Sequence, residues 1–187
     1  MIVINWFKKL LTSLNLFKKE AKIAFLGLEN AGKSSLLIRM KHGKFVQVDP
    51  TINPKSEIIE VGKVRFKAFD LGGHDNVLKL WGNYYPFVDA IIFMVDASCT
   101  ETLPKAADEL WKLLENPKIK HVPILIFGNK IDKGEALDQQ SLREALGISS
   151  PDNKKDNNLE RVEVFMCSVA KNIGILDGFK WLNNRLP

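Results

Sequence analysis

The stretch that decides the fold is Gly27-Leu28-Glu29-Asn30-Ala31-Gly32-Lys33-Ser34. It matches G-x-x-x-x-G-K-[ST], a loop whose backbone amides form an anion nest, whose lysine contacts the outer phosphates and whose hydroxyl binds Mg²⁺. An apolar run precedes the loop and a helical pattern opens at Lys33, which is the strand-to-helix context that phosphate binding needs. We expect this site to contain Asn30, Ala31, Gly32, Lys33, Ser34 and Ser35.

A second motif, Asn129-Lys130-Ile131-Asp132, follows a later apolar run. Its amide suits the acceptor edge of guanine, and the Asp132 carboxylate suits the ring N–H and amino donors. Adenine would leave Asp132 desolvated and unpaired, a mismatch that can reject an analogue by roughly 10⁴-fold. Together the two motifs predict a GTP/GDP site that includes Asn129, Lys130 and Asp132.

The metal site is expected to draw on three segments. Asp70 ends a strand-like run and precedes two glycines, so its carboxylate can reach Mg²⁺ through water. Thr51 follows Asp49-Pro50 in a polar connection and offers a hydroxyl when the third phosphate is present. Ser34, Thr51 and Asp70 are the predicted metal residues.

Hydrolysis is assigned to Lys33, Gly73 and His74. Gly73 can turn its amide toward the terminal phosphate, and His74 directly after it can position the attacking water. Residues 47–51 contain no arginine. We therefore expect slow unaided turnover and a GTPase-activating partner whose arginine is worth roughly 10³ to 10⁵ in rate.

Short apolar runs alternate with amphipathic stretches from residue 21 onward, which predicts an α/β fold with a largely parallel sheet. A two-residue connection, Gly62-Lys63, predicts one antiparallel pair at the sheet edge. Residues 149–158 read as a surface loop. Strands are expected at 23–26, 58–61, 64–70, 90–95, 124–128 and 162–167, and helices at 33–41, 103–114, 139–146 and 175–186.

Composition indicates one globular domain with a full core, since the chain has 187 residues and 45% hydrophobic content. Cys99 and Cys167 lie far apart without metal-ligand spacing, which favours buried thiols in a reducing, cytoplasmic compartment over a disulfide. Residues 1–22 hold five lysines and one glutamate, so four of the five net positive charges lie there. A nucleic-acid surface on the main domain is therefore not expected.

The first nineteen residues are strongly amphipathic. At about 100° per residue, eight of their apolar side chains fall within an arc of roughly 160° that only Lys18 interrupts, opposite Lys8, Lys9 and Lys19. Ile2 and Leu16 are exceptions on the polar side. This pattern describes a helix lying in a membrane interface, too short and too charged to span a bilayer. The alternative is a helix folded onto the protein's own core, and both states can occur with different nucleotides. The predicted membrane residues are Val3, Ile4, Trp6, Phe7, Leu10, Leu11, Leu14 and Phe17.

Other membrane anchors are not expected. Residue 2 is Ile rather than Gly, and residues 184–187 contain no prenylation cysteine. Lys8 and Lys9 interrupt the apolar residues that a signal peptide would need, so we expect this segment to stay in the protein.

The chain resembles the Arf and Sar branch of small Ras-like GTPases, most closely the Sar family that initiates COPII coat assembly on the endoplasmic reticulum. Asn30-Ala31 and the two glycines after Asp70 are similar to the whole branch. His74, where Arf and Ras-like proteins place Gln, is a Sar trait, as are the segments 166–169 and 178–182. Glu29 and Leu78 depart from the Sar pattern.

The resemblance implies a P-loop, Ras-like G domain over residues 20–187, with a mostly parallel six-stranded sheet and helices on both faces. It also implies that Ser168 and Val169 cover the guanine, with the Val169 amide toward the base carbonyl. GTP would shift the antiparallel hairpin and push the helix of residues 1–19 into lipid. The implied partners are an exchange factor, a GTPase-activating subunit of the inner COPII coat and the cytosolic face of the endoplasmic reticulum or Golgi, with a monomer in solution.

Two alternatives remain open. Leu78 replaces a basic residue common in the second switch, which allows a nucleotide-dependent scaffold that does not hydrolyse GTP. An Arf-like GTPase acting at another membrane is the second.

Overall fold

The structure is a computed structural model that describes residues 21–43, 45–46, 55–61, 64–70, 78–148 and 159–186. The predicted membrane helix, Thr51, Gly73 and His74 lie outside the described residues, as does the expected surface loop at 149–158. The phosphate-loop motif, the N-K-x-D segment and Asp70 all lie within them.

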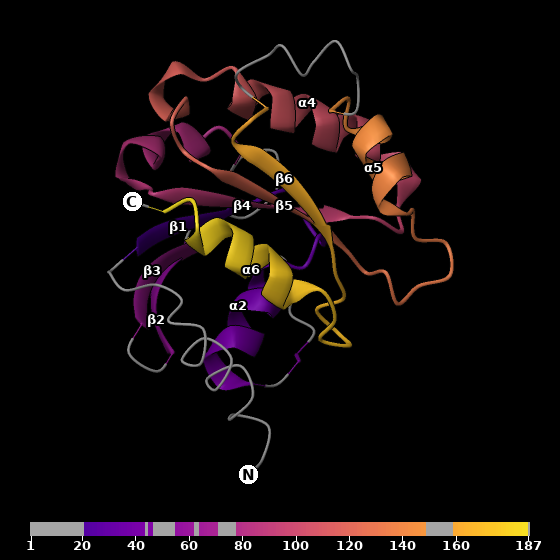
Figure 1. Cartoon of the computed structure of the whole chain (residues 1–187), viewed down its shortest axis with the longest axis horizontal. Coiled ribbons are helices and arrows are strands. Elements are labelled where there is room, and N and C mark those ends of the chain that lie inside the picture. Colours follow the sequence, from indigo (N-terminus) through magenta and orange to yellow (C-terminus); the bar gives the residue numbers. More distant parts are fainter. Residues whose placement is uncertain are drawn as a thin grey trace.

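One six-stranded sheet runs through this part, in the order β2-β3-β1-β4-β5-β6 (Figure 1). All neighbouring strands are parallel except β2 and β3, which are antiparallel from Lys55↔Asp70 to Val61↔Val64. This arrangement confirms the expected sheet and its antiparallel edge. The strands are β1 Ala21–Leu26, β2 Lys55–Val61, β3 Val64–Asp70, β4 Ala90–Asp96, β5 Ile124–Asn129 and β6 Val162–Met166.

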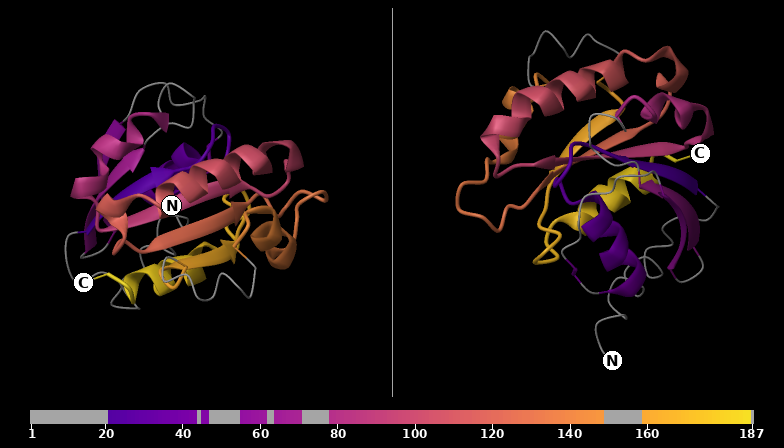
Figure 2. Two further views of the ribbon diagram at one scale, coloured as in Figure 1. Left: turned by 90° about the horizontal axis from the view of Figure 1, so that it is seen from above. Right: turned by 180° about the vertical axis from the view of Figure 1, so that it is seen from behind.

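Helices cover both faces of the sheet (Figures 1 and 2). Apolar side chains of α2 (Lys33–His42) and α6 (Ile175–Asn183) join one buried cluster. Those of α4 (Leu103–Leu114) and α5 (Gln139–Ala145) join the cluster on the opposite face. The central strands β4 and β5 are buried along their whole length, as strands covered on both faces must be.

The described residues include four short 3₁₀ segments that were not predicted. They are too short to show a hydrophobic period and lie in connections between longer elements. They are η1 Trp81–Asn83, η2 Tyr85–Phe87, η3 Thr100–Thr102 and η4 Pro117–Ile119.

The parallel strands bring their carboxyl ends to one edge of the sheet, where ligands bind in open α/β folds. Asp70 ends β3, Asp96 ends β4 and Asn129 ends β5. Both sequence motifs therefore meet at this edge. Within the described residues, no helix is long and apolar enough to cross a bilayer.

Candidate nucleotide-binding site

The loop between β1 and α2 takes a backbone path that needs glycine. Gly27 has a φ of 123° and Gly32 a φ of 102°, both in the left-handed region. A Cβ at Gly27 would lie 2.1 Å from the carbonyl oxygen of Met94, and one at Gly32 would lie 2.3 Å from Nδ2 of Asn129. The glycines of the motif thus let the loop pack against β4 and the second motif.

Lys33 opens α2 with its ammonium turned into the loop. Its Nζ donates to the carbonyl oxygens of Gly27 at 2.8 Å and Leu28 at 2.7 Å, and the residue is only 5% exposed. Burial lowers the pKa of Lys33 to about 8, although Asp70 and Glu29 act in the opposite direction. A buried cation is therefore held within a loop of backbone dipoles.

Ser34 and Asp70 come from different elements and meet directly. The Ser34 hydroxyl donates to Oδ2 of Asp70 at 2.6 Å, and Asp70 is buried at the end of β3. Hydroxyl and carboxylate oxygens are the hard ligands that Mg²⁺ prefers. The chemistry of this pair fits the metal that the sequence predicts, and Ser35 follows in the same helical turn, partly buried.

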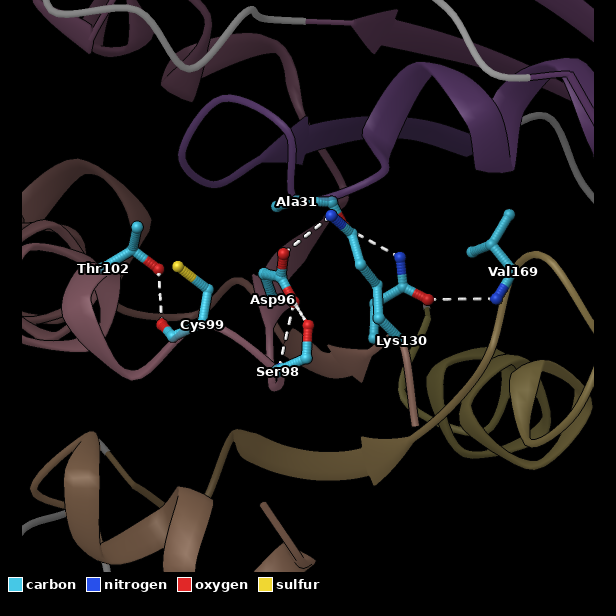
Figure 3. Close-up of polar contacts among 8 residues, drawn as sticks. Ala31, Asp96, Ser98, Cys99, Thr102, Lys130 and Val169 are labelled. Atoms are coloured by element: carbon cyan, nitrogen blue, oxygen red, sulfur yellow. Dashed lines mark hydrogen bonds and ion pairs between the residues drawn. The ribbon is translucent and has the colours of Figure 1, made fainter. Parts of the chain in front are cut away.

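Asn129 joins three segments through one side chain. Its Nδ2 donates to the Ala31 carbonyl oxygen at 2.8 Å, and its Oδ1 accepts from the backbone N–H of Val169 at 3.0 Å (Figure 3). The residue is 3% exposed. The sequence predicted that both the Asn129 amide and the Val169 N–H face the base. In the structure they bind each other, so Asn129 ties the phosphate loop to the segment after β6.

Asp132 is oriented by that same segment. The Ser168 hydroxyl donates to Oδ1 of Asp132 and accepts the backbone N–H of Lys171 at 2.9 Å. Ser168 is fully buried, whereas Asp132 is exposed, so a buried hydroxyl orients a carboxylate that a ligand can reach. The structure therefore places the predicted base-reading carboxylate beside the two residues predicted to cover the base.

The surroundings of Lys130 include two residues that sequence reasoning missed. Lys130 has a φ of 71°, and its Nζ lies 2.7 Å from Oδ2 of Asp96 (Figure 3). Oδ1 of Asp96 accepts the backbone N–H of Ser98 at 3.0 Å and the Ser98 hydroxyl at 2.6 Å. Burial acts to raise the pKa of Asp96, but the hydrogen bonds from Lys130 and Ser98 hold it below its usual range.

A signal for Asp96 exists in the sequence, because it ends an apolar strand run just as Asn129 does. The two residues are in register between β4 and β5. Ser98 has no such signal, since a loop serine is usually only solvated.

A phosphate loop with a buried lysine, beside an N-K-x-D segment at the same sheet edge, defines a small GTP-binding protein of the P-loop class. The chain belongs to the ADP-ribosylation factor family, whose model matches residues 7–186. It is a GTPase that binds GTP and GDP, which confirms the fold and the activity expected from the sequence.

Relatives over nearly the full length include proteins of the Sar type. The chain is 40% identical to "Small COPII coat GTPase SAR1" of Giardia intestinalis, over 97% of this chain and 98% of that protein. It is 38% identical to the protein of the same name from Nicotiana tabacum, over 98% of each chain. "ADP-ribosylation factor 3" of Arabidopsis thaliana is 34% identical over 90% of this chain and 89% of that protein.

Among solved structures, the Arl6 BBS3 small GTPase from Trypanosoma brucei with the bound nucleotide analogue GppNp is similar. The TM-score is 0.78 at 28% identity, covering 90% of this chain and all of that chain. The resemblance to the Arf and Sar branch is thereby confirmed.

Proposed function

We propose that this GTPase is a Sar-type switch that, in its GTP state, binds the membrane of the endoplasmic reticulum and recruits the COPII coat for vesicle transport. Two relatives named as small COPII coat GTPases match nearly the whole chain at 40% and 38% identity. The observation that carries the nucleotide site is the Asn129 side chain, which joins the loop expected to bind phosphate to the segment expected to cover the base.

Different residues are proposed to bind the phosphates and the base of the nucleotide. An ammonium has three N–H donors, and Lys33 gives two to loop carbonyls, so the third is the one we assign to a phosphate oxygen. Asp132, aligned by Ser168, reads the guanine donors, and Lys130, held by Asp96, lies at the same end of the site. The remaining contacts are assigned to Asn30, Ala31, Gly32, Ser34, Ser35, Thr51, Gly73, Asn129 and Val169.

Mg²⁺, when bound, neutralises charge on the phosphate oxygens. Ser34 and Asp70 would hold it. Thr51, which lies outside the described residues, is the third proposed ligand. The Ser34 hydroxyl already lies 2.6 Å from the Asp70 carboxylate, so two oxygen ligands are close together.

For hydrolysis, we assign the water-positioning role to His74 and a phosphate contact to the amide of Gly73. Stabilisation of the transition-state charge by this chain falls to Lys33. Since residues 47–51 contain no arginine, a subunit of the inner COPII coat is proposed to supply one.

The switch is proposed to connect the nucleotide to residues 1–19, the membrane-binding segment that precedes the GTPase domain of residues 20–187. A ligand biases two states only through a difference in affinity. Thr51 and Gly73 would provide that difference. They would contact the third phosphate of GTP, and GDP has no third phosphate for them to contact. An exchange factor would reload the protein with GTP.

GTP hydrolysis measured with and without the inner COPII coat complex tests this function. We expect slow turnover alone and an increase of about 10³-fold or more with the coat, in line with an arginine supplied in trans. His74→Ala should lose the increase, and His121→Ala, which alters an exposed histidine, should keep it. Turnover that does not respond to the coat would contradict the COPII assignment, and ATP bound as tightly as GTP would contradict the guanine site.

A further inference from the structure

The segment after β6 forms a small closed loop. The backbone N–H of Ser168 donates to the Ile173 carbonyl oxygen at 3.0 Å, and the N–H of Ile173 donates to the Ser168 carbonyl oxygen at 3.1 Å. Near the tip, Asn172 has a φ of 64°. Loop 168–173 contains both residues predicted to cover the base, so its position determines where they lie.

Arg39 of α2 holds the tip of this loop from outside. Its Nη1 donates to the carbonyl oxygens of Val169 at 2.7 Å and Ala170 at 3.2 Å. Its Nε donates to Oδ1 of Asn172 at 3.2 Å. One planar guanidinium therefore binds three of the four residues between the two ends of the loop, and Ser168 at its base aligns Asp132.

The helix that carries Arg39 also carries Lys33 and Ser34 at its first turn. Arg39 follows Ser34 by five residues, or about 7.5 Å of helix. Phosphate contacts and the clamp on loop 168–173 are thus parts of one rigid element.

We propose that Arg39 is a positioning residue for guanine specificity, which fixes loop 168–173 and through Ser168 the carboxylate of Asp132. This inference rests on the proposed nucleotide site. Arg39 is not itself among the proposed nucleotide contacts, and it acts on the base half of the site through the backbone of the loop, including the Val169 carbonyl oxygen. A forked donor suits this task, because lysine would present a point donor in place of the rigid fork.

The test compares GDP with IDP, which lacks the 2-amino group that Asp132 would bind. Dissociation constants for both are measured on the full chain and on Arg39→Met, Arg39→Lys and Arg143→Met. Arg143 serves as the matched control, because its guanidinium pairs with Glu163 on another part of the surface at 2.8 Å. Thermal melting of each variant reports its fold.

We expect Arg39→Met to lower the preference for GDP over IDP by about 3- to 10-fold, the effect of losing the alignment of one hydrogen bond. The GDP/IDP preference of Arg39→Lys should lie between those of Arg39→Met and the original chain. Arg143→Met should keep the preference of the original chain. A merely structural role would weaken GDP and IDP by the same factor, and that result would overturn the inference.

The outcomes separate the inference from the proposed function. If the original chain does not prefer GDP to IDP, the guanine site itself is wrong. If the original chain prefers GDP and both Arg39 variants keep that preference, only the role of Arg39 is wrong. Should Arg39→Met fail to fold, an unchanged ratio in Arg39→Lys overturns the inference by itself.

Discussion

Lys33 is placed to couple proton binding to the phosphate binding that we propose for it. Its ammonium is buried against the carbonyls of Gly27 and Leu28, and burial lowers its pKa to about 8 from an ordinary 10.5. Between these two values the unfolded chain binds more protons than the folded chain. Stability therefore rises with pH in this window, as the cost of burying the charged form is relieved.

The affinity for nucleotide should fall as pH rises, opposite to the change in stability. A phosphate oxygen beside Lys33 favours the ammonium, so we expect GDP binding to take up about half a proton at pH 8 and to weaken by up to about tenfold per unit above it. Calorimetry in two buffers of different ionisation enthalpy measures the uptake. In Lys33→Arg, the remaining affinity for GDP should no longer depend on pH in this range, because the guanidinium stays charged. No proton uptake at pH 8 would contradict the assignment.

At the scale of elements, the contact of α6 with β5 depends on the absence of one side chain. A Cβ at Gly178 would lie 2.5 Å from Cε1 of Phe127 and 3.2 Å from Cδ1 of Leu125. The ring of Phe127 also packs against that of Phe179, with centroids 5.9 Å apart. Since β5 ends at Asn129, this packing supports the strand that carries the second motif.

Gly178→Ala should therefore lower stability. Overpacking costs about 1 to 3 kcal/mol, and the better helix propensity of alanine returns at most about 1 kcal/mol. Each net kcal/mol corresponds to roughly 2 to 4 °C in Tm for a chain of this size. Gly82→Ala is the matched control, because a Cβ there meets no described atom within 4 Å. Equal melting temperatures for the two variants would show that α6 can shift without cost.

The sequence predicted the regular elements well, because their signals are local. The helix expected at 103–114 has the same bounds in the structure, and the strand expected at 64–70 does too. The ends of some elements differ from the prediction where pairing with another strand decides them. The strand predicted to begin at residue 23 begins at Ala21, because Ala21 pairs with Phe66 of β3. The 3₁₀ segments were not predicted because three residues are too few to show a hydrophobic period.

Within the candidate site, motif residues were predictable and their supports were not. Ser34 and Asp70 were predicted to serve one metal site, and the structure brings their side chains into direct contact, while their metal role stays a prediction. Arg39 and Asp96 act on residues distant in sequence. The end of an apolar run marks the position of Asp96 but not its partner, and no local pattern marks Arg39. The roles of Thr51 and His74 stay predictions, since both lie outside the described residues.

At the scale of the whole molecule, the nucleotide site and the proposed membrane segment belong to different parts of the chain. The GTPase domain is nearly neutral, and four of the five net positive charges lie within residues 1–22. Attraction to anionic lipid therefore concentrates on the segment that is proposed to respond to GTP.

Liposome flotation checks this division. We expect the chain to float with liposomes when loaded with a non-hydrolysable GTP analogue and far less with GDP. Trp6→Asp with Leu10→Asp should abolish flotation, because burying each apolar side chain is worth about 1.5 to 3 kcal/mol, or tenfold or more in binding. Asn5→Asp with Ser13→Asp adds the same charge to the polar side and should weaken flotation less. Equal flotation in both nucleotide states would contradict the switch.

The buried carboxamide of Asn129 also bears on how the protein ages. At 3% exposure, this amide is shielded from the water that deamidation requires. Conversion to a carboxylate would place an oxygen where Nδ2 now lies, 2.8 Å from the carbonyl oxygen of Ala31, and two acceptors would then face each other without a proton. A single hydrolysed amide would thus remove the hydrogen bond that joins the two motifs.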